Sequence, residues 1–290
     1  ATSGTAIRIT GTTATTNTAG YQGLWLYGNS VAKPYYVMAT GGGDISLNGS
    51  ANASVSQSDG VRLSYADILS SSGVITVTGV VRGVNLHQPT TLGYLAGSLV
   101  PTSTANISLV GDVMAFTSSS VVASSGQLTL KPYTAGTTIG LGSGAGSLSL
   151  ASSLFSGGTR IFADGFSGIT IGSSIAGNMA VGGALAFTDT ATLQSNGNIT
   201  LNSGATITNS QAGAYMALAA TGNFVNNAGA SAISTTDSGS TDRWVVYSNT
   251  PSSNTFGSLN SANTPVWGKS IATLAPSGVD PGNRYVFASN

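Results

Sequence analysis

The chain has 290 residues, with nine Lys and Arg, nine Asp, no Glu and one His, so its formal net charge is zero. Without net charge it has no general attraction for polyanions, and we expect neither nucleic acid nor membrane insertion among its interactions. The absence of Cys excludes disulfides and thiolate metal sites, and a single His cannot supply an ordinary histidine metal site. We therefore expect no metal and no other cofactor.

Disorder is the first alternative for a chain with 40 Gly and abundant Ser and Thr. Disordered chains are usually poor in apolar residues and rich in net charge, whereas 41% of these residues are hydrophobic. The lack of Glu and the many β-branched residues also disfavour extensive helix. The composition thus indicates an ordered, mainly β protein.

The N-terminal segment 1–40 combines a predicted strand at 6–10 with the most aromatic part of the chain. Trp25, Tyr27, Tyr35 and Tyr36 lie close together in the sequence. The favoured interpretation is that they fill or widen the first coils of the fold, because large aromatic side chains commonly fill core space. The alternative is a surface on which glycans stack.

Strands are next predicted at 44–49, 61–65, 74–79 and 83–87. Between residues 88 and 104, Pro89, Pro101 and the segment 92–100 predict a loop or a looser coil, because Pro cannot donate to a β-ladder. The register of these strands is less regular than that of the segment that follows.

One short alternating strand then occurs four times between residues 106 and 171, with two apolar residues separated by Ser or Thr. Such alternation is typical of a strand with one buried and one exposed face. The intervening segments are rich in Gly, Ser, Thr and Ala and cannot supply a layer of helices. The first apolar residues recur at a nearly constant interval, at Ile107, Leu128, Leu148 and Ile169.

This period predicts an all-β fold, a right-handed parallel β-helix (β-solenoid) with about 20 residues per coil. At roughly 20 residues and about 4.8 Å per coil, the chain would form on the order of 14 coils and a rod roughly 65 Å long. Its exposed ends would favour end-to-end self-association into a filament.

Further strands are predicted at 184–188, 198–202, 205–209, 215–219 and 222–227. Leu185, Ile199 and Met216 follow one another at shorter intervals than the preceding repeat, which suggests that coil length drifts. The last segment differs, with strands at 242–248 and 284–288, two Trp, and Pro residues that include Pro251, Pro265 and Pro276. We therefore predict a β-helix stalk over residues 1–236 and a final coil with a cap or connector over 237–290.

Two segments resemble the repeat region of filamentous-haemagglutinin-like large exoproteins of Gram-negative bacteria, the two-partner secretion type of adhesin. They are Gln127-Leu-Thr-Leu-Lys-Pro-Tyr through Ser147-Leu-Ser-Leu, and Asp164-Gly-Phe-Ser-Gly-Ile-Thr-Ile-Gly. Arg243-Trp-Val-Val-Tyr-Ser, with Gly282-Asn-Arg-Tyr-Val-Phe-Ala, is similar to the segment that closes such a β-helix.

The resemblance covers about residues 100–290 and implies a secreted stalk on the outer cell surface, acting in adhesion or biofilm formation. The Asn-Pro-Asn-type motifs of the family's secretion domain have no counterpart, so we expect an internal or C-terminal piece of a larger protein. The partners implied are host or bacterial cell surfaces or glycans.

Catalytic patterns are weak. Asp59 with Asp67, or Asp164 with Asp189, could supply paired carboxylates, but nothing gathers the other groups that glycoside hydrolysis needs. Most Asp residues adjoin Gly, Ser or Thr, which is typical of turns. A catalytic triad would depend on His87, which we interpret as a turn or surface residue. No catalytic, metal or cofactor residue is therefore predicted, and the ligand-binding residues are not identified.

Three functions follow from these observations. The first is a structural and adhesive stalk, which is not an enzyme. The second is a carbohydrate-active enzyme on a β-helix. The third is an ice- or surface-binding solenoid, suggested by Thr clusters at 10–18 and at Thr76 and Thr78, although Thr does not recur at one phase of the repeat.

Overall fold

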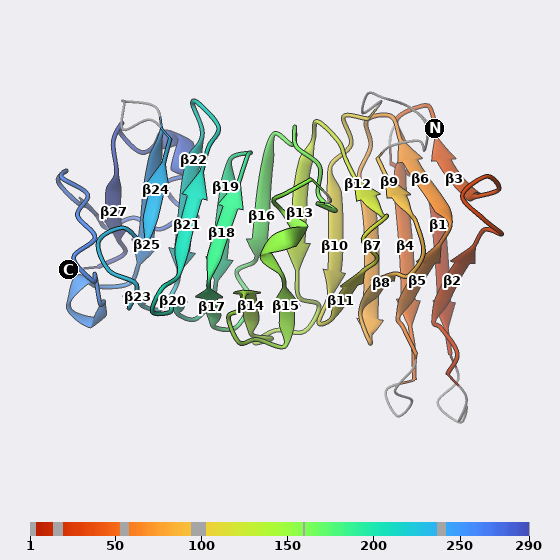
Figure 1. Ribbon diagram of the computed structural model, residues 1–290, viewed down its shortest axis with the longest axis horizontal. Coiled ribbons are helices and arrows are strands. Elements are labelled where there is room, and N and C mark those ends of the chain that lie inside the picture. Colours follow the sequence, from red (N-terminus) through yellow and green to blue (C-terminus); the bar gives the residue numbers. More distant parts are fainter. Residues whose placement is uncertain are drawn as a thin grey trace. The chain divides into compact units, whose positions relative to one another are not determined.

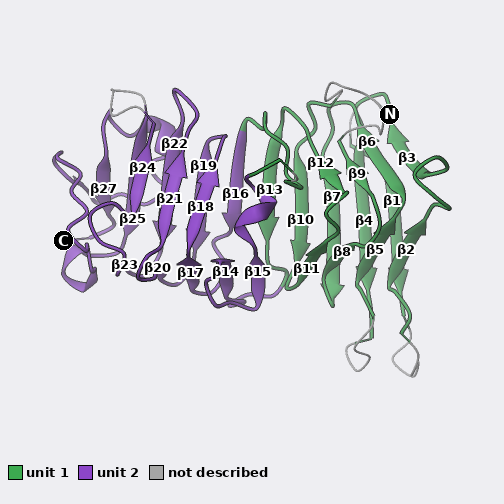
Figure 2. Ribbon diagram, viewed as in Figure 1, with its two compact units in different colours: residues 1–133, 157–167 green, residues 134–156, 168–290 purple. Residues whose placement is uncertain are grey.

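The structure is a computed structural model that describes residues 4–13, 20–52, 58–93, 103–158, 160–236 and 242–289. All strand pairs described within its sheets are parallel, as expected for a β-solenoid. The chain forms two compact units, one comprising residues 1–133 and 157–167, the other residues 134–156 and 168–290 (Figure 2). The predicted parallel β fold is therefore confirmed (Figure 1).

The described strands of unit 1 belong to three parallel sheets, and we call the parts of these sheets within the unit 1a, 1b and 1c. Sheet 1a consists of β1 (Thr5–Thr12), β4 (Asp44–Ser50), β7 (Ile75–Val81), β10 (Ile107–Gly111) and β13 (Gln127–Lys131). Sheet 1b consists of β2 (Leu24–Tyr27), β5 (Val61–Ser64), β8 (Val84–Leu86) and β11 (Met114–Phe116). Sheet 1c consists of β3 (Tyr35–Ala39), β6 (Ala66–Ser70), β9 (Thr91–Leu92) and β12 (Val121–Val122).

The described strands of unit 2 likewise belong to three parallel sheets, and we call the parts within this unit 2a, 2b and 2c. Sheet 2a consists of β16 (Gly168–Gly172), β19 (Ala191–Ser195), β22 (Tyr215–Ala220), β25 (Arg243–Ser248), β27 (Arg284–Phe287) and β26 (Val266–Trp267). Sheet 2b consists of β15 (Leu148–Leu150), β14 (Ile139–Gly142), β17 (Met179–Gly182), β20 (Ile199–Leu201) and β23 (Phe224–Asn226). Sheet 2c consists of β18 (Ala184–Phe187), β21 (Thr206–Asn209) and β24 (Ile233–Thr235).

Three short 3-10 turns complete the regular structure that is described, at Ser152–Leu154, Pro251–Ser253 and Pro276–Gly278. Each is a single turn, and among the described residues no helix is long and apolar enough to cross a membrane.

A coil contributes one strand to each sheet of its unit and is usually longer than predicted. In sheet 1a, Ile45 pairs with Ile75 and Ile75 with Ile107, and these two steps are clearly longer than the next one, from Ile107 to Leu128. In sheet 2a, the steps lengthen steadily along the row Ile171, Leu193, Leu218 and Val246. The structure thus does not confirm the predicted coil length as a general one.

The predicted repeat counted some strands of one coil as separate coils. Leu148 does not follow Leu128 in its row, because β15 pairs with β14 in sheet 2b, where Leu148 lies opposite Ile139. Leu185, Ile199 and Met216 likewise belong to sheets 2c, 2b and 2a. Their close spacing therefore reflects successive faces of a coil, and it is not a drift in coil length.

The core is built from the apolar residues of the alternating strands, stacked in rows along each unit. Ile45, Ile75 and Ile107 have no more than 1% of their surface exposed, while the Ser and Thr residues between them and the next apolar residue face outward. Burying apolar surface stabilises a protein by about 25 cal/mol per Å². Each coil can bury its row only against its neighbours, so stacking is the source of stability.

Side-chain amides and carboxylates near the strand ends also join neighbouring coils. Asn106 Oδ1 accepts the backbone N–H of Gln127 at 2.8 Å, and Asp44 Oδ1 accepts that of Val74 at 2.8 Å. Asp112 Oδ1 does the same for Tyr133 at 3.0 Å. The sequence analysis interpreted such Asp residues as turn residues. In the structure, these side chains also accept hydrogen bonds from the next coil.

The favoured interpretation of the N-terminal aromatics was wrong. Trp25, Tyr27, Tyr35 and Tyr36 are all exposed, and the core positions of β2 are filled by Leu24 and Leu26. The period-2 alternation explains this, because successive side chains of a strand point to opposite faces. The aromatic rings therefore lie on the outside of unit 1.

The closing segment is β-rich, as predicted. Strand β25 pairs with β22 and with β27, and β26 pairs with β27 as the last strand of sheet 2a. Val245, Tyr247 and Val286 are buried together with Ala217, Ala219 and Val279. Tyr247 Oη donates to the carbonyl oxygen of Leu274 at 3.0 Å, and this packing fixes residues 270–279 against the sheet.

Candidate functional site

The outer surface of sheet 1b carries aromatic, charged and amide side chains in register. Trp25 of β2 lies opposite Arg62 of β5, and Arg62 lies opposite Asn85 of β8. Each is the outward residue between two buried apolar ones in its strand. We call Trp25, Tyr27, Asp59, Arg62 and Asn85 the Trp25 face.

Trp25 is held in place by three neighbours. Its indole Nε1–H donates to Ser64 Oγ at 3.2 Å, and the Arg62 guanidinium carbon lies 5.6 Å from the ring centroid. Tyr27 contacts it edge to face, with ring centroids 5.3 Å apart. Aromatic pairs of this geometry and cation–π contacts each contribute on the order of 1 kcal/mol, so the ring orientation is set within the protein itself.

Asp59 precedes β5 and contacts residues of β5 and β8 and of the segment before β2. Its Oδ2 accepts a hydrogen bond from Asn85 Nδ2 at 3.0 Å and lies 3.6 Å from an Arg62 nitrogen. Its backbone N–H donates to Gln22 Oε1. Burial raises the pKa of Asp59, while the Asn85 hydrogen bond and the charges of Arg62 and His87 act in the opposite direction.

His87 directly follows β8, and its backbone N–H donates to the Leu63 carbonyl at 2.9 Å. The side chain is partly exposed. Burial and the positive charge of Arg62 lower its pKa, and the carboxylate of Asp59 acts in the opposite direction. The lowered pKa favours the neutral imidazole, and the charged side chains that define the Trp25 face are Asp59 and Arg62.

Of the acidic pairs considered in the sequence, Asp59 and Asp67 do not share one sheet surface, and Asp164 and Asp189 belong to different units. Asp59 lies beside sheet 1b, whereas Asp67 belongs to β6 of sheet 1c, is buried and accepts a hydrogen bond from Thr91 Oγ1. Asp164 pairs with Arg160 at 3.8 Å, and Asp189 is a buried residue of unit 2. Residues 14–18 of the Thr cluster, residues 94–100 of the predicted loop and Pro101 lie outside the described residues.

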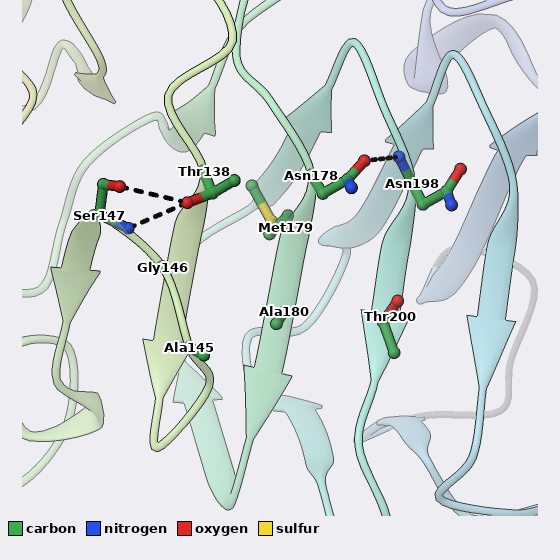
Figure 3. A pocket seen from close by; sticks show the side chains of 9 residues that line it. All are labelled: Thr138, Ala145, Gly146, Ser147, Asn178, Met179, Ala180, Asn198 and Thr200. Carbon is green, nitrogen blue, oxygen red and sulfur yellow. Dashed lines mark hydrogen bonds between the residues drawn. The ribbon is translucent and has the colours of Figure 1, made fainter.

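A shallow depression on sheet 2b has a volume of about 420 Å³ and is polar without charge (Figure 3). The residues labelled in the figure lie in β17 and β20, directly before β14, β17 and β20, and in the segment between β14 and β15. Asn178 Oδ1 accepts the backbone N–H of Asn198 at 2.9 Å, and Thr138 Oγ1 accepts that of Ser147 at 3.0 Å. These polar groups hold neighbouring coils together, which gives the depression a structural role.

An apolar groove of about 440 Å³ lies near the end of sheet 2a. Trp267 and Phe287 approach with centroids 5.0 Å apart, and Phe256 packs on Tyr285 at 4.8 Å. Tyr285 Oη donates to the Leu259 carbonyl at 2.7 Å. No charged side chain is among the described residues that line this groove, so it offers apolar contact and little polar recognition.

In comparisons with known proteins, no family model, curated protein or solved structure matches this chain. The resemblance to haemagglutinin-like exoproteins therefore rests on the quoted motifs alone.

Trp25 and Tyr27 were considered as a possible glycan-stacking surface, but Asp59, Arg62 and Asn85 were missed because the residues of the Trp25 face are spread over three strands. Its signal was nonetheless present in the sequence. Leu24-Trp25-Leu26, Val61-Arg62-Leu63 and Val84-Asn85-Leu86 share one pattern, with a polar or aromatic residue between two apolar ones. Applying the alternation used for Ile107-Ser108-Leu109 to these triplets places Trp25, Arg62 and Asn85 on the outer surface.

Proposed function

We propose that this chain is a structural and adhesive segment of a secreted bacterial protein displayed on the outer cell surface, where it mediates attachment, aggregation or biofilm formation. The observation that carries the proposal is the stack of parallel coils in each unit, with apolar residues inside and mainly uncharged polar residues outside. Such a stack gains length by adding coils, and each coil adds outer surface for contacts.

The chemistry of that surface supports contact and does not support catalysis. The Trp25 face offers exposed rings, an ion pair and an amide, and it contains one carboxylate, that of Asp59, which is held by Arg62 and Asn85. Glycoside hydrolysis needs two carboxyl groups on opposite sides of a bond. The proposed role is therefore binding without turnover.

The proposal is tested by coupling the purified chain to fluorescent beads and measuring their adhesion to epithelial cells, bacterial cells and films of extracted polysaccharide. We expect adhesion above that of bare beads on at least one surface, and its loss after the chain is unfolded on the bead. Adhesion no greater than that of bare beads on every surface would contradict the proposal.

Incubation of the same chain with the polysaccharides gives the matched test of turnover. We expect no release of new reducing ends. A time-dependent release that scales with protein concentration would instead favour a β-helical carbohydrate-active enzyme.

A further inference from the structure

Two large aromatic rings of the Trp25 face are directed away from the core. The exposed fraction is 52% for Trp25 and 54% for Tyr27, whereas Trp244 of unit 2 is only 2% exposed. Leu24 and Leu26 already fill the inner face of β2, so the rings are not needed for core packing. Exposed aromatic surface with a polar rim is typical of binding sites.

The rings are fixed before any ligand arrives. The Trp25 indole N–H is bonded to Ser64 Oγ, Tyr27 packs edge to face on the ring, and the guanidinium of Arg62 lies over it. A ligand that stacks on the exposed part of either ring therefore loses little free energy to ordering these side chains.

The charges of the Trp25 face select against ions. The Asp59 carboxylate and the Arg62 guanidinium are 3.6 Å apart, so their opposite charges offset one another. An anionic ligand would have to compete with Asp59 for Arg62, and a cationic ligand with Arg62 for Asp59. The surface is thus complementary to an uncharged molecule.

Hydrogen-bonding groups flank the rings. Asp59 contributes carboxylate oxygens and Asn85 an amide, and both lie beside or within the same sheet as Trp25. Consecutive strands are about 4.8 Å apart, so the row from Trp25 through Arg62 to Asn85 spans roughly 10 Å, the length of a disaccharide.

We propose that the Trp25 face binds a neutral saccharide, with the apolar face of a pyranose ring against Trp25 or Tyr27 and its hydroxyls bonded to Asp59 and Asn85. A pyranose matches this surface because its C–H bonds form an apolar face and its hydroxyls lie at the edge. The inference rests on the proposed adhesive function and names the ligand class of that function.

The test is titration calorimetry of the full chain with cellohexaose, maltohexaose, laminarihexaose and mannohexaose, with hexagalacturonate as the charged probe. We expect binding of at least one neutral hexasaccharide and no binding of hexagalacturonate. Trp25→Ala is expected to weaken binding by at least about tenfold, because an aromatic contact is lost from the surface of a strand whose core residues remain. Trp25→Phe is expected to retain part of the affinity.

Trp267→Ala is the matched control, because Trp267 is 45% exposed but lies in unit 2, outside the Trp25 face. The affinity of the Trp267→Ala variant for the saccharide should equal that of the unmodified chain. A second readout uses Trp267→Phe, in which Trp25 is the exposed tryptophan and Trp244 is buried, so that a change in fluorescence on saccharide binding reports on Trp25.

The inference is overturned if no neutral hexasaccharide binds, if hexagalacturonate binds more tightly, or if Trp25→Ala binds as the unmodified chain does. Bead adhesion separates this outcome from failure of the proposed function. Beads carrying Trp25→Ala that adhere as well as the unmodified chain would reject the site and leave the adhesive role standing. Beads carrying the unmodified chain that adhere to nothing would reject the adhesive role itself.

Discussion

At the scale of single residues, Asp59 is the group whose environment gives a clear pH dependence. Burial raises its pKa above the ordinary value of 3.8, so the folded chain binds this proton more tightly than the unfolded chain. The resulting stability is complete below pH 3.8 and is lost as the pH rises through the higher pKa of the folded state.

Asp59→Asn should therefore remove this loss. We expect the free energy of unfolding of the unmodified chain to fall relative to that of Asp59→Asn as the pH rises from about 3 to about 6. At neutral pH the variant should be no less stable, because a partly buried charge is gone. Urea unfolding at a series of pH values measures the difference between the two proteins.

Asn85→Ala provides the opposite change. Its amide donates to Asp59 Oδ2 and lowers the pKa of the carboxyl, so its removal should raise that pKa further and enlarge the pH dependence. For the Asp59→Asn prediction, the contradicting outcome is a pH profile of stability that parallels that of the unmodified chain, because another group would then produce the pH dependence.

At the scale of the strand and its turn, close approach between coils determines where glycine is required. Gly172 ends β16 at φ +92°, and a Cβ there would lie 1.9 Å from the Gln194 carbonyl oxygen of β19. Gly204 has a similar φ of +76°, but no atom lies within 4 Å of its Cβ position. Comparing an alanine substitution at Gly172 with one at Gly204 therefore distinguishes the cost of steric conflict from that of backbone strain.

Both Gly172→Ala and Gly204→Ala should lower the free energy of unfolding by about 1 to 2 kcal/mol, because alanine is strained in the left-handed backbone conformation. Gly172→Ala should lose about 1 to 3 kcal/mol more, because strands β16 and β19 must move apart. Chemical unfolding of the two variants, which lie in the same unit, measures the difference. Equal losses would mean that the coils can adjust to the added methyl group without cost.

The strands could be predicted from the sequence, but their number in each coil could not. Alternation in segments such as Ile107-Ser108-Leu109 is local, and it predicted strands and a parallel stack correctly. The number of strands per coil depends on which strands pair, and pairing is not local. Met179–Gly182 and Ala191–Ser195 were not predicted because Ala, Gly and Thr dilute their apolar pattern, so each coil was given too few strands.

The Trp25 face shows this limit most clearly. Trp25, Arg62 and Asn85 meet because β2, β5 and β8 are neighbours in register, although the step along the chain from Trp25 to Arg62 is much longer than that from Arg62 to Asn85. Two unequal coil lengths must be known before these residues can be placed together. The direction of each side chain, in contrast, follows from its own triplet.

At the scale of the whole molecule, the stability of the fold should depend little on ionic strength. Only 6% of residues are charged, and the ion pairs Arg62–Asp59 and Arg160–Asp164 are 3.6 and 3.8 Å long and partly exposed. Exposed pairs of this kind contribute about 0 to 1 kcal/mol each, and salt screens them. We expect the Tm in about 0.5 M NaCl to lie within about 3 °C of its value in about 0.01 M NaCl.

Sodium sulfate at the same ionic strength should act differently, because it is excluded from protein surfaces and strengthens the burial of apolar groups. Rows such as Ile45, Ile75 and Ile107 carry the packing of the coils, so the Tm should rise in sulfate while it is nearly constant in chloride. Scanning calorimetry in the two salts measures both effects. A fall of the Tm in chloride by more than about 5 °C would contradict this prediction, because it would show that charge pairs contribute substantially to the stability of the stack.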